Sequence, residues 1–243
     1  MKCLRTEYWR SKLYPEKWTQ DPVAALAREI TPFLGASRRV LDLGAGRGRS
    51  GLPFSFEEDT TLFGIDLDTG LGSNPYLHHA VIAAAEELPF SNESFQLVIG
   101  IYVFEHFQYP LHVLREVHRV LARGGHFVFL TPNLFHYVGL ISLLTPLSFH
   151  KWINKKRGRI EKDTFPTYYG FNSRSRMKRV LGQTGFEPVM LRSLEVQPNY
   201  LLWSLPTFVA GALYERMVSR FEILSPFRAC ILGILRKVER KIV

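Results

Sequence analysis

The stretch Val40–Gly48, V-L-D-L-G-A-G-R-G, decides the fold of this 243-residue chain. Its first four residues form an apolar run, broken only by Asp42, of the kind found in buried parallel strands. Glycines then stand at alternate positions: Gly44, Gly46 and Gly48. Because glycine has no Cβ, the backbone can turn sharply here and a ligand can approach it closely. With a helix or helical turn expected over 49–56, the stretch predicts the nucleotide-binding corner of a doubly wound α/β sheet.

The spacing of these glycines indicates which nucleotide is bound. A dinucleotide fingerprint, G-x-G-x-x-G, would need a third glycine at the position of Arg49, which argues against a dehydrogenase. The pattern present is D-x-G-x-G-x-G, from Asp42 to Gly48. It resembles motif I of the class I S-adenosylmethionine-dependent methyltransferases. The resemblance implies S-adenosyl-L-methionine as the cofactor and a Rossmann-like, mostly parallel seven-stranded sheet.

A second strand is expected over Thr61–Asp66, which ends in an acid 22 residues beyond Gly44. In doubly wound folds an acid at this place accepts hydrogen bonds from the ribose hydroxyls. Asp68 is expected to cap the turn that follows. Further strands are expected over 78–83, 95–101, 126–131 and 186–196, and helices over 21–33, 110–121, 173–181 and 227–242.

A second set of motifs lies between Ala84 and Asn133. It contains E-E-L-P-F, S-F, E-H, L-R-E-V-H-R-V-L, G-G and P-N in that order. The set resembles the methyltransferase subgroup that includes the ubiquinone and menaquinone C-methyltransferases, and the combined resemblance runs from about Arg39 to Asn133. Ala84 and Gln96 depart from the pattern, since family members often have Asp at these positions. Because the first of these acids contacts the adenine, a non-catalytic scaffold on a degenerate methyltransferase fold is an alternative.

The resemblance assigns the cofactor to residues near the ends of the predicted strands. They are Asp42, Gly44, Ala45, Gly46, Gly48, Asp66, Leu67, Ala85, Glu86 and Ile101. The glycine-turn backbone would approach the methionyl and ribosyl parts, while Asp42 would brace the turn or bind a water at the cofactor ammonium. Asp66 would hold the ribose and Leu67 would pack on the adenine. The Ala85-Glu86 backbone would meet the adenine edge, and Ile101 would face the methionyl arm.

A catalytic base is expected only for some acceptors. Holding two reactants in line lowers the activation barrier by roughly 7–11 kcal/mol. A general base accelerates the reaction by a further factor of about 10²–10⁴. A sugar or alcohol hydroxyl is the kind of acceptor that would need such a base. His106 is the first candidate because it follows the fourth predicted strand on the cofactor side. His136 and Tyr137 come next. No metal site is predicted, because Cys3 and Cys230 lack metal-ligand or redox spacing.

The basic charge is concentrated in the last third of the chain. Residues 1–150 hold 13 Lys and Arg and 15 Asp and Glu, about −2, whereas residues 151–243 hold 18 and 7, about +11. We expect a methyltransferase domain over 1–200, with a substrate-cap insertion at about 134–172. An apolar and basic helical extension is expected over 201–243. Such an extension predicts contact with an anionic membrane surface, a second subunit or its own domain.

These features favour O- or C-methylation of a lipophilic or lipid-linked small molecule at a membrane surface. The two cysteines fit a reducing compartment, and the N-terminus lacks the apolar core of a signal peptide, so a cytoplasmic location is expected. An RNA or protein methyltransferase that uses the basic surface is the alternative. It is less favoured because I-Y-V-F-E-H, residues 101–106, replaces the Asn/Asp-Pro-Pro-aromatic motif of many N-methylating enzymes. Nucleic acid is thus not a favoured partner, whereas an oligomer is compatible with the sequence.

Overall fold

The computed structural model describes residues 4–15, 21–48, 52, 54–145, 166–202 and 204–238. The chain forms two compact units. Unit 1 consists of Met1–Pro22, Pro132–Thr167 and Ser193–Ile231, and unit 2 consists of Val23–Thr131, Tyr168–Arg192 and Leu232–Val243. Each unit is therefore assembled from segments that are far apart in the sequence.

A seven-stranded sheet in the order β3-β2-β1-β4-β5-β7-β6 is the main element. Its strands are β1 (Arg39–Leu43), β2 (Thr61–Asp66), β3 (His79–Ile82), β4 (Phe95–Ile101), β5 (Leu121–Pro132), β6 (Phe186–Leu194) and β7 (Cys230–Lys237). The pairs β1–β2, β2–β3, β1–β4 and β4–β5 are parallel. The strand order changes direction between β1 and β4, where α/β sheets bind ligands at the carboxyl ends of the strands. The predicted doubly wound sheet is confirmed.

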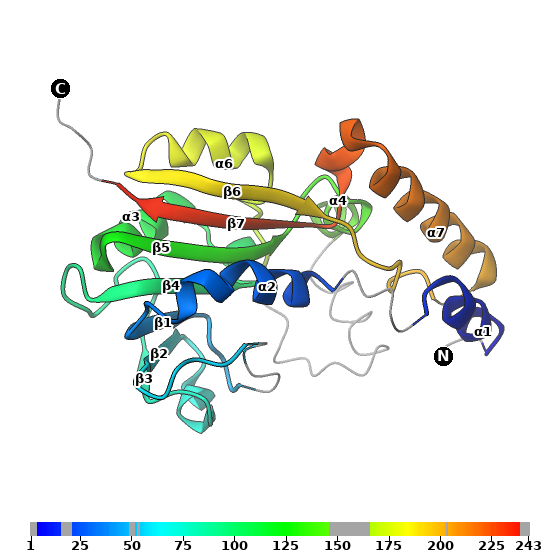
Figure 1. Ribbon diagram of the computed structural model, residues 1–243. Helices are drawn as coiled ribbons and strands as arrows, with labels where there is room; N and C mark the ends of the chain where they lie inside the picture. The colour runs from blue at the N-terminus through cyan, green and yellow to red at the C-terminus, as the bar shows by residue number, and fades with distance from the viewer. Residues whose placement is uncertain are drawn as a thin grey trace. The chain divides into compact units, whose positions relative to one another are not determined.

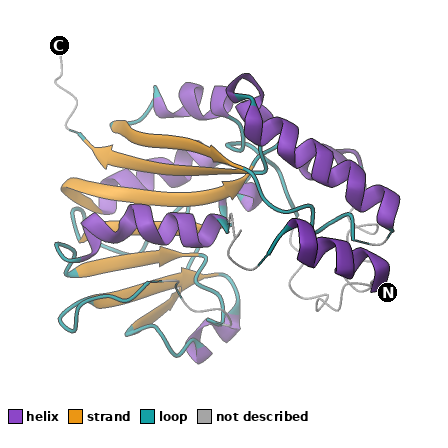
Figure 2. Cartoon of the chain, turned by 45° about the vertical axis from the view of Figure 1, so that its right-hand side comes forward, coloured by secondary structure: helices purple, strands orange, loops and turns teal. Residues whose placement is uncertain are grey.

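Helices cover the sheet of unit 2. They are α2 (Pro22–Leu34), α3 (Pro110–Val120) and α6 (Arg174–Leu181), with short 3-10 turns η1 (Thr69–Ser73) and η2 (Phe104–His106). Figures 1 and 2 show α2 on one face of the sheet and α3 on the other. Each turns an apolar stripe inward, with Leu26 and Ile30 of α2 and Val113 and Val117 of α3 fully buried. This core holds the carboxyl ends of β1, β2 and β4 in place.

The predicted basic amphipathic helix over 227–242 is wrong for the described part of that segment. The 3-10 turn η4 (Glu222–Phe227) ends at Phe227, and Cys230–Lys237 forms β7. This strand lies between β5 and β6, so nearly all its residues are buried, including Ile231, Leu232, Ile234 and Leu235. A strand covered on both faces is apolar at successive positions, and that run imitates helical spacing.

Unit 1 contains the helices α1 (Leu4–Leu13), α4 (Tyr137–Leu144) and α7 (Leu205–Arg220), together with η4. Ser204 caps α7 by accepting a hydrogen bond from the Thr207 N–H. Tyr14 packs with Leu202, Phe208 and Ala212 in a small apolar core. Among the described residues, none of the helices combines the length and the apolar character that crossing a membrane requires.

Some expectations stay predictions. They include the domain boundary at residue 200 and the substrate cap at about 134–172, of which residues 146–165 lie outside the described residues. The helix expected over 49–56 is wrong for its described residues, since residues 52 and 54–56 are not helical, while residues 49–51 and 53 lie outside the described residues.

Candidate active site

The glycine turn after β1 has the backbone conformation that its sequence requires. Gly44, Gly46 and Gly48 have φ of 71°, 51° and 67°, a region that side chains rarely tolerate. The N–H groups of Gly44 and Ala45 both donate to the Ile65 carbonyl, at 2.9 Å and 3.1 Å, which ties the turn to β2. A Cβ at Gly46 would meet nothing closer than 3.9 Å. The turn thus leaves room for a ligand beside its middle glycine.

Asp66 connects the glycine turn to the end of β2. Its Oδ2 accepts from the Gly46 N–H at 2.9 Å, and its Oδ1 accepts from the Asp68 N–H at 2.8 Å. These bonds fix the orientation of the carboxylate. A carboxylate offers about four acceptor positions, so both oxygens keep capacity for a ligand hydroxyl.

Asp42 lies inside β1, 8% exposed. Burial, and then the charge of Asp66, raises its pKa to about 7. A carboxyl with this pKa is about half protonated at neutral pH. It can therefore donate as well as accept a hydrogen bond beneath the turn, which suits the expected bracing role.

Asn74 is a part of this site that the sequence patterns did not indicate. Its Nδ2 donates to the carbonyls of Ala45, at 3.0 Å, and Gly46, at 3.2 Å. Its side chain also occupies the space that a Cβ at Gly48 would need. Asn74 follows η1 in a loop without periodicity, and no local motif marks it.

Two side chains beyond β2 take separate roles. Asp68 caps η1 by accepting from the Gly70 N–H, which confirms the prediction. It also binds Arg47 through two hydrogen bonds of 2.8 Å and 3.0 Å. Leu67, which lies between Asp66 and Asp68 in the sequence, is 71% exposed. Its apolar side chain is therefore open to solvent beside Asp66.

The other predicted cofactor residues lie on neighbouring elements. The Ala83 N–H donates to the Asp66 carbonyl at 3.2 Å, which brings the loop containing buried Ala85 and half-buried Glu86 next to β2. Ile101 ends β4, one residue beyond the partner of Leu43 in β1. The structure therefore places these residues around the carboxyl ends of β1, β2, β3 and β4.

Glu105 is a buried carboxyl group that the sequence patterns did not single out as a site residue. It lies in η2, just after β4, and is 7% exposed. Thr131 Oγ1 donates to its Oε2 at 3.3 Å, and Asn172 Nδ2 donates to Thr131 Oγ1 at 2.5 Å. Burial raises the pKa of Glu105 to about 7. The E-H pair, Glu105-His106, is its only signal in the sequence.

The predicted catalytic bases belong to different units. His106 is half-buried next to Glu105 in unit 2, and its backbone N–H donates to the Val103 carbonyl. His136 and Tyr137 belong to unit 1. His136 Nδ1 accepts from the Val138 N–H at 3.4 Å and caps α4. Burial, followed by the charge of Glu195, raises the pKa of Tyr137, so this phenol stays protonated at neutral pH.

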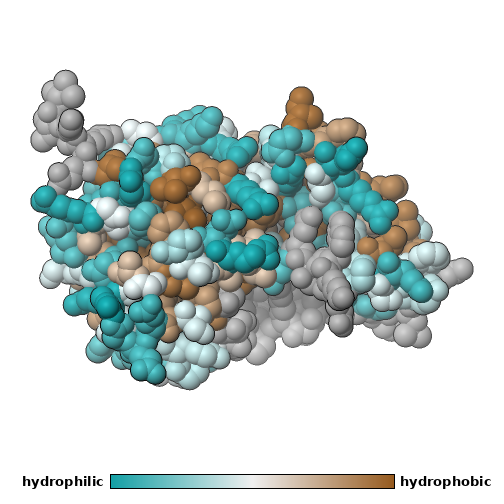
Figure 3. Space-filling view, viewed as in Figure 1, coloured by the Kyte–Doolittle hydropathy of each residue, from teal (hydrophilic) through white to brown (hydrophobic). Residues whose placement is uncertain are grey.

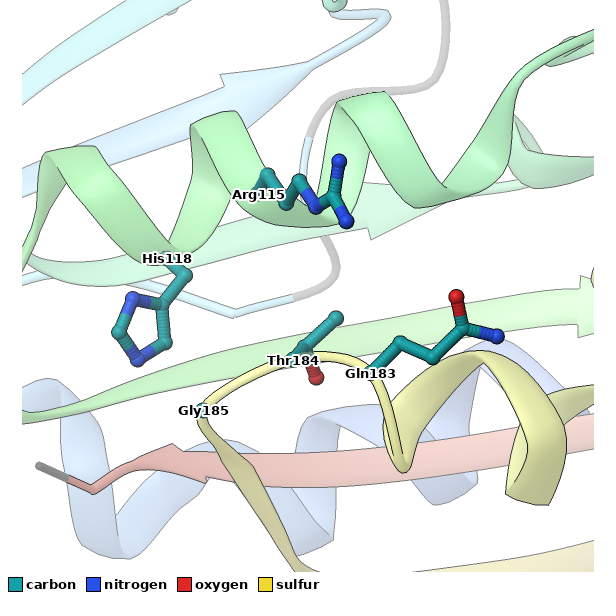
Figure 4. A pocket seen from close by; sticks show the side chains of 5 residues that line it. All are labelled: Arg115, His118, Gln183, Thr184 and Gly185. Atoms are coloured by element: carbon teal, nitrogen blue, oxygen red, sulfur yellow. The ribbon is translucent and has the colours of Figure 1, made fainter. Parts of the chain in front are cut away.

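A separate pocket of about 190 Å³ lies between α3 and the turn before β6 (Figure 4). It is lined by Arg115, His118, Gln183, Thr184 and Gly185. Because α3 ends where β5 begins, this pocket faces the amino ends of the strands. It is therefore not part of the site at the glycine turn. Among the described residues, no cluster of three or more His, Cys, Asp or Glu side chains could hold a metal ion.

Comparison with known proteins agrees with this geometry. A family model described as a methyltransferase domain matches residues 15–191. The demethylmenaquinone methyltransferase of Chlamydia trachomatis is 27% identical over 129 residues, 50% of this chain and 51% of that protein. The chain thus spans about half the length of the curated relatives it matches.

Solved structures show the same fold. A methyltransferase of Haloferax volcanii, in complex with the Trm112 methyltransferase activator, has a TM-score of 0.59 at 17% identity, over 98% of this chain and 97% of its own. The geranyl diphosphate C-methyltransferase of Streptomyces coelicolor, in complex with S-adenosyl-L-homocysteine, has a TM-score of 0.53 at 15% identity, over 88% of this chain and 78% of its own.

Proposed function

Because this chain belongs to the class I S-adenosylmethionine-dependent methyltransferases, we propose that it methylates a lipophilic or lipid-linked small molecule at oxygen or carbon. Its cofactor is S-adenosyl-L-methionine. The observation that carries the choice of acceptor is an exposed apolar face on α7 of unit 1.

The residues at the glycine turn fit the cofactor. Gly46 leaves space for the cofactor beside the turn, and Asp66 can still accept hydrogen bonds from ribose hydroxyls. Exposed Leu67 offers an apolar surface to the adenine ring. When bound, S-adenosyl-L-methionine supplies an activated methyl group on a sulfonium. The remaining task of the chain is to orient the acceptor, to exclude water and to receive a proton where the acceptor loses one.

Glu105 is the proposed proton acceptor, with His106 beside it as the alternative. A general base works best when its pKa lies near the operating pH, and burial places the pKa of Glu105 at about 7. The hydrogen bond from Thr131 holds its carboxylate in place. Glu105 lies in η2, four residues after Ile101, the expected methionyl contact at the end of β4. His136 and Tyr137 stay predictions.

The exposed face of α7 is unusually apolar. Val209, Leu213, Met217 and Phe221 follow at intervals of four residues and are all exposed, Leu213 to 64%. Figure 3 shows apolar side chains in brown on the right, where Figure 1 places α7. The buried face of the same helix is also largely apolar, with Phe208, Ala212 and Val218 beside Glu215. An ordinary surface helix instead has a polar solvent face. We call the four exposed residues the α7 apolar stripe.

The charge beside the α7 apolar stripe suits an anionic membrane surface. Arg216 and Arg220 are exposed next to Met217 and Phe221. Each Lys or Arg near an anionic leaflet contributes about 1 kcal/mol, and an exposed apolar helix face inserts at the headgroup boundary. A lipophilic acceptor dissolved in that surface would then be within reach of the protein.

Flotation with phosphatidylcholine vesicles, with and without phosphatidylglycerol, tests the membrane part at physiological salt. We expect the protein to float with the anionic vesicles, and Leu213→Glu or Met217→Glu to lower the bound fraction severalfold. Val189→Glu changes an equally exposed apolar residue on β6 and should bind like the parent protein. Equal binding by Leu213→Glu and the parent, or no binding by either, would contradict the proposal.

An RNA or protein acceptor is the second candidate. The formal charge of about +11 over residues 151–243 favours it. Absent vesicle binding together with intact binding of S-adenosyl-L-methionine would move the assignment to this candidate. Absent cofactor binding would instead favour a scaffold role.

A further inference from the structure

Two motifs that are distant in the sequence, E-E-L-P-F and L-R-E-V-H-R-V-L, meet in unit 2. The first follows β3 and contains Leu88, and the second includes the last part of α3, with Glu116 and Arg119. Glu116 Oε2 accepts from the Leu88 N–H at 2.8 Å, and Arg119 Nη2 donates to the Leu88 carbonyl at 2.8 Å. Both backbone polar groups of Leu88 are therefore bonded to α3. We call Glu116 and Arg119 the α3 clamp.

The guanidinium of Arg119 uses its full set of donors. Nε and Nη2 donate to the two carboxylate oxygens of Glu116, at 2.8 Å and 2.7 Å. Nη1 donates to the Phe90 carbonyl at 2.7 Å and to Asn92 Oδ1 at 3.1 Å. With the bond to Leu88, these contacts match the rigid fork of donors that a guanidinium carries and an ammonium lacks. The hydrogen bonds from Arg119 lower the pKa of Glu116, so the pair is ionised at neutral pH.

The α3 clamp anchors the turn formed by residues 84–87, which comes directly before Leu88. The Glu87 N–H closes this turn by donating to the Ala84 carbonyl at 3.2 Å. At the other end of the turn, the Ala83 N–H donates to the Asp66 carbonyl at 3.2 Å. The turn is thus attached to β2 at its start and to α3 at its end, and its backbone has a fixed position.

This turn presents backbone donors at the place expected for the adenine edge. The N–H groups of Ala85 and Glu86 donate to no acceptor among the described residues, although Ala85 is only 8% exposed. Ala84, at the position where family members often have Asp, has no side-chain group that could bond to the base. Recognition of the base therefore depends on the backbone whose position the α3 clamp fixes.

We propose that Glu116 and Arg119 are positioning residues that make the cofactor site selective for adenine. They act through Leu88 on the backbone of residues 84–87, not by contact with the cofactor. Hydrogen bonds weaken steeply as their geometry departs from linear, so a turn released from α3 would discriminate poorly between bases. This inference rests on the proposed function, since it concerns the S-adenosyl-L-methionine site.

Calorimetric titration of the full chain with S-adenosyl-L-homocysteine and with S-inosyl-L-homocysteine tests this role. The two compounds have nearly the same shape. The inosyl base, however, has an N–H donor at N1 and a carbonyl at C6, where adenine has an acceptor and an amine. We expect the parent protein to bind the adenosyl compound at least about tenfold more tightly, because a mismatched base leaves polar groups unpaired.

Arg119→Lys is the main variant, because it keeps the charge beside Glu116 and removes the fork. Its affinity for the adenosyl compound should fall about tenfold, and its preference for adenine should shrink to about two- or threefold. Arg115→Lys makes the same change at an exposed position of the same helix and should behave like the parent protein. Glu116→Gln keeps the shape of its side chain but loses the ion pair, and should also narrow the preference.

Thermal unfolding midpoints establish that each variant is folded. A parent-like preference for adenine in either folded variant would overturn the inference, even where the midpoint is lower, and would leave the α3 clamp a purely structural role. Equal binding of the two compounds by the parent protein would also overturn it, because the turn would then not distinguish the bases. A parent protein that binds neither compound would instead remove the proposed function itself.

Discussion

Asp42 is a buried residue whose ionisation opposes folding. Its pKa is about 7 in the folded protein and 3.8 as an isolated side chain. The folded state thus binds this proton more tightly, so the stability associated with it is present at low pH and is lost as the pH rises toward 7. Asp42→Asn removes the titration. The stability of the variant relative to the parent should therefore rise by roughly 3 kcal/mol between pH 5 and pH 8.

Urea unfolding of both proteins at the two pH values measures this difference. Comparison with the parent cancels the titration of Glu105, which both proteins share. Glu58→Gln, at an exposed position, serves as the control and should follow the parent at both pH values. Parallel stability profiles for the parent and Asp42→Asn would show that Asp42 is not protonated by burial.

Glu105→Gln tests the proposed base. With an acceptor found by screening, turnover should fall about 10²–10⁴-fold, while the affinity for S-adenosyl-L-methionine changes little. In the parent protein, turnover should rise with pH and level off above about 7, because the carboxyl group must be ionised to accept a proton. Initial rates between pH 5 and pH 9 measure this profile. A large loss in His106→Ala with normal turnover in Glu105→Gln would assign the role to the histidine instead.

The sequence predicted one part of the site better than another. Gly44, Gly46 and Asp66 follow from local rules, since a positive φ requires glycine and a strand end positions the acid. Asn74 and Glu105 act through contacts with distant segments. A hydrogen bond from Thr131 to Glu105, or from Asn74 to the glycine turn, leaves no periodic pattern in the chain.

At the scale of single elements, one substitution in β7 distinguishes a strand from a helix, because the two structures predict opposite changes in the free energy of unfolding. Gly233 lies in the middle of this strand, and a Cβ there would collide with the Phe129 ring. Gly233→Ala should therefore lower the free energy of unfolding by about 1–3 kcal/mol, the usual cost of overpacking. In a helix the same change would stabilise by about 1 kcal/mol. Urea unfolding of the parent and the variant decides between the two structures, and a variant more stable than the parent would contradict the assignment of this segment to a strand.

The parallel strands and most helices of unit 2 could be predicted, because their apolar periods and their caps are local. Ser173, for example, caps α6 as expected by accepting from the Arg176 N–H. The strand β7 could not, because its burial depends on β5 and β6, which precede it by many residues. Its apolar run with scattered basic residues is compatible with both a helix and a covered strand.

At the scale of the whole molecule, all the residues that the sequence assigns to the cofactor fall in unit 2. Local sequence patterns could not predict unit 1, because it joins three separated segments. The Tyr14 hydroxyl donates to Glu215 Oε2 at 3.0 Å, a contact between the first helical segment and α7. Only the fold reveals that such residues are neighbours.

Calorimetric titration of the full chain with S-adenosyl-L-methionine and S-adenosyl-L-homocysteine tests the central claim most directly. We predict micromolar binding of both, weakened at least about tenfold by Asp66→Ala, since hydrogen bonds to a charged group contribute about 1.5–3 kcal/mol. Glu58→Ala, at an exposed position, should bind like the parent. A folded protein that binds neither compound, or an Asp66→Ala variant that binds both normally, would contradict the account of this site.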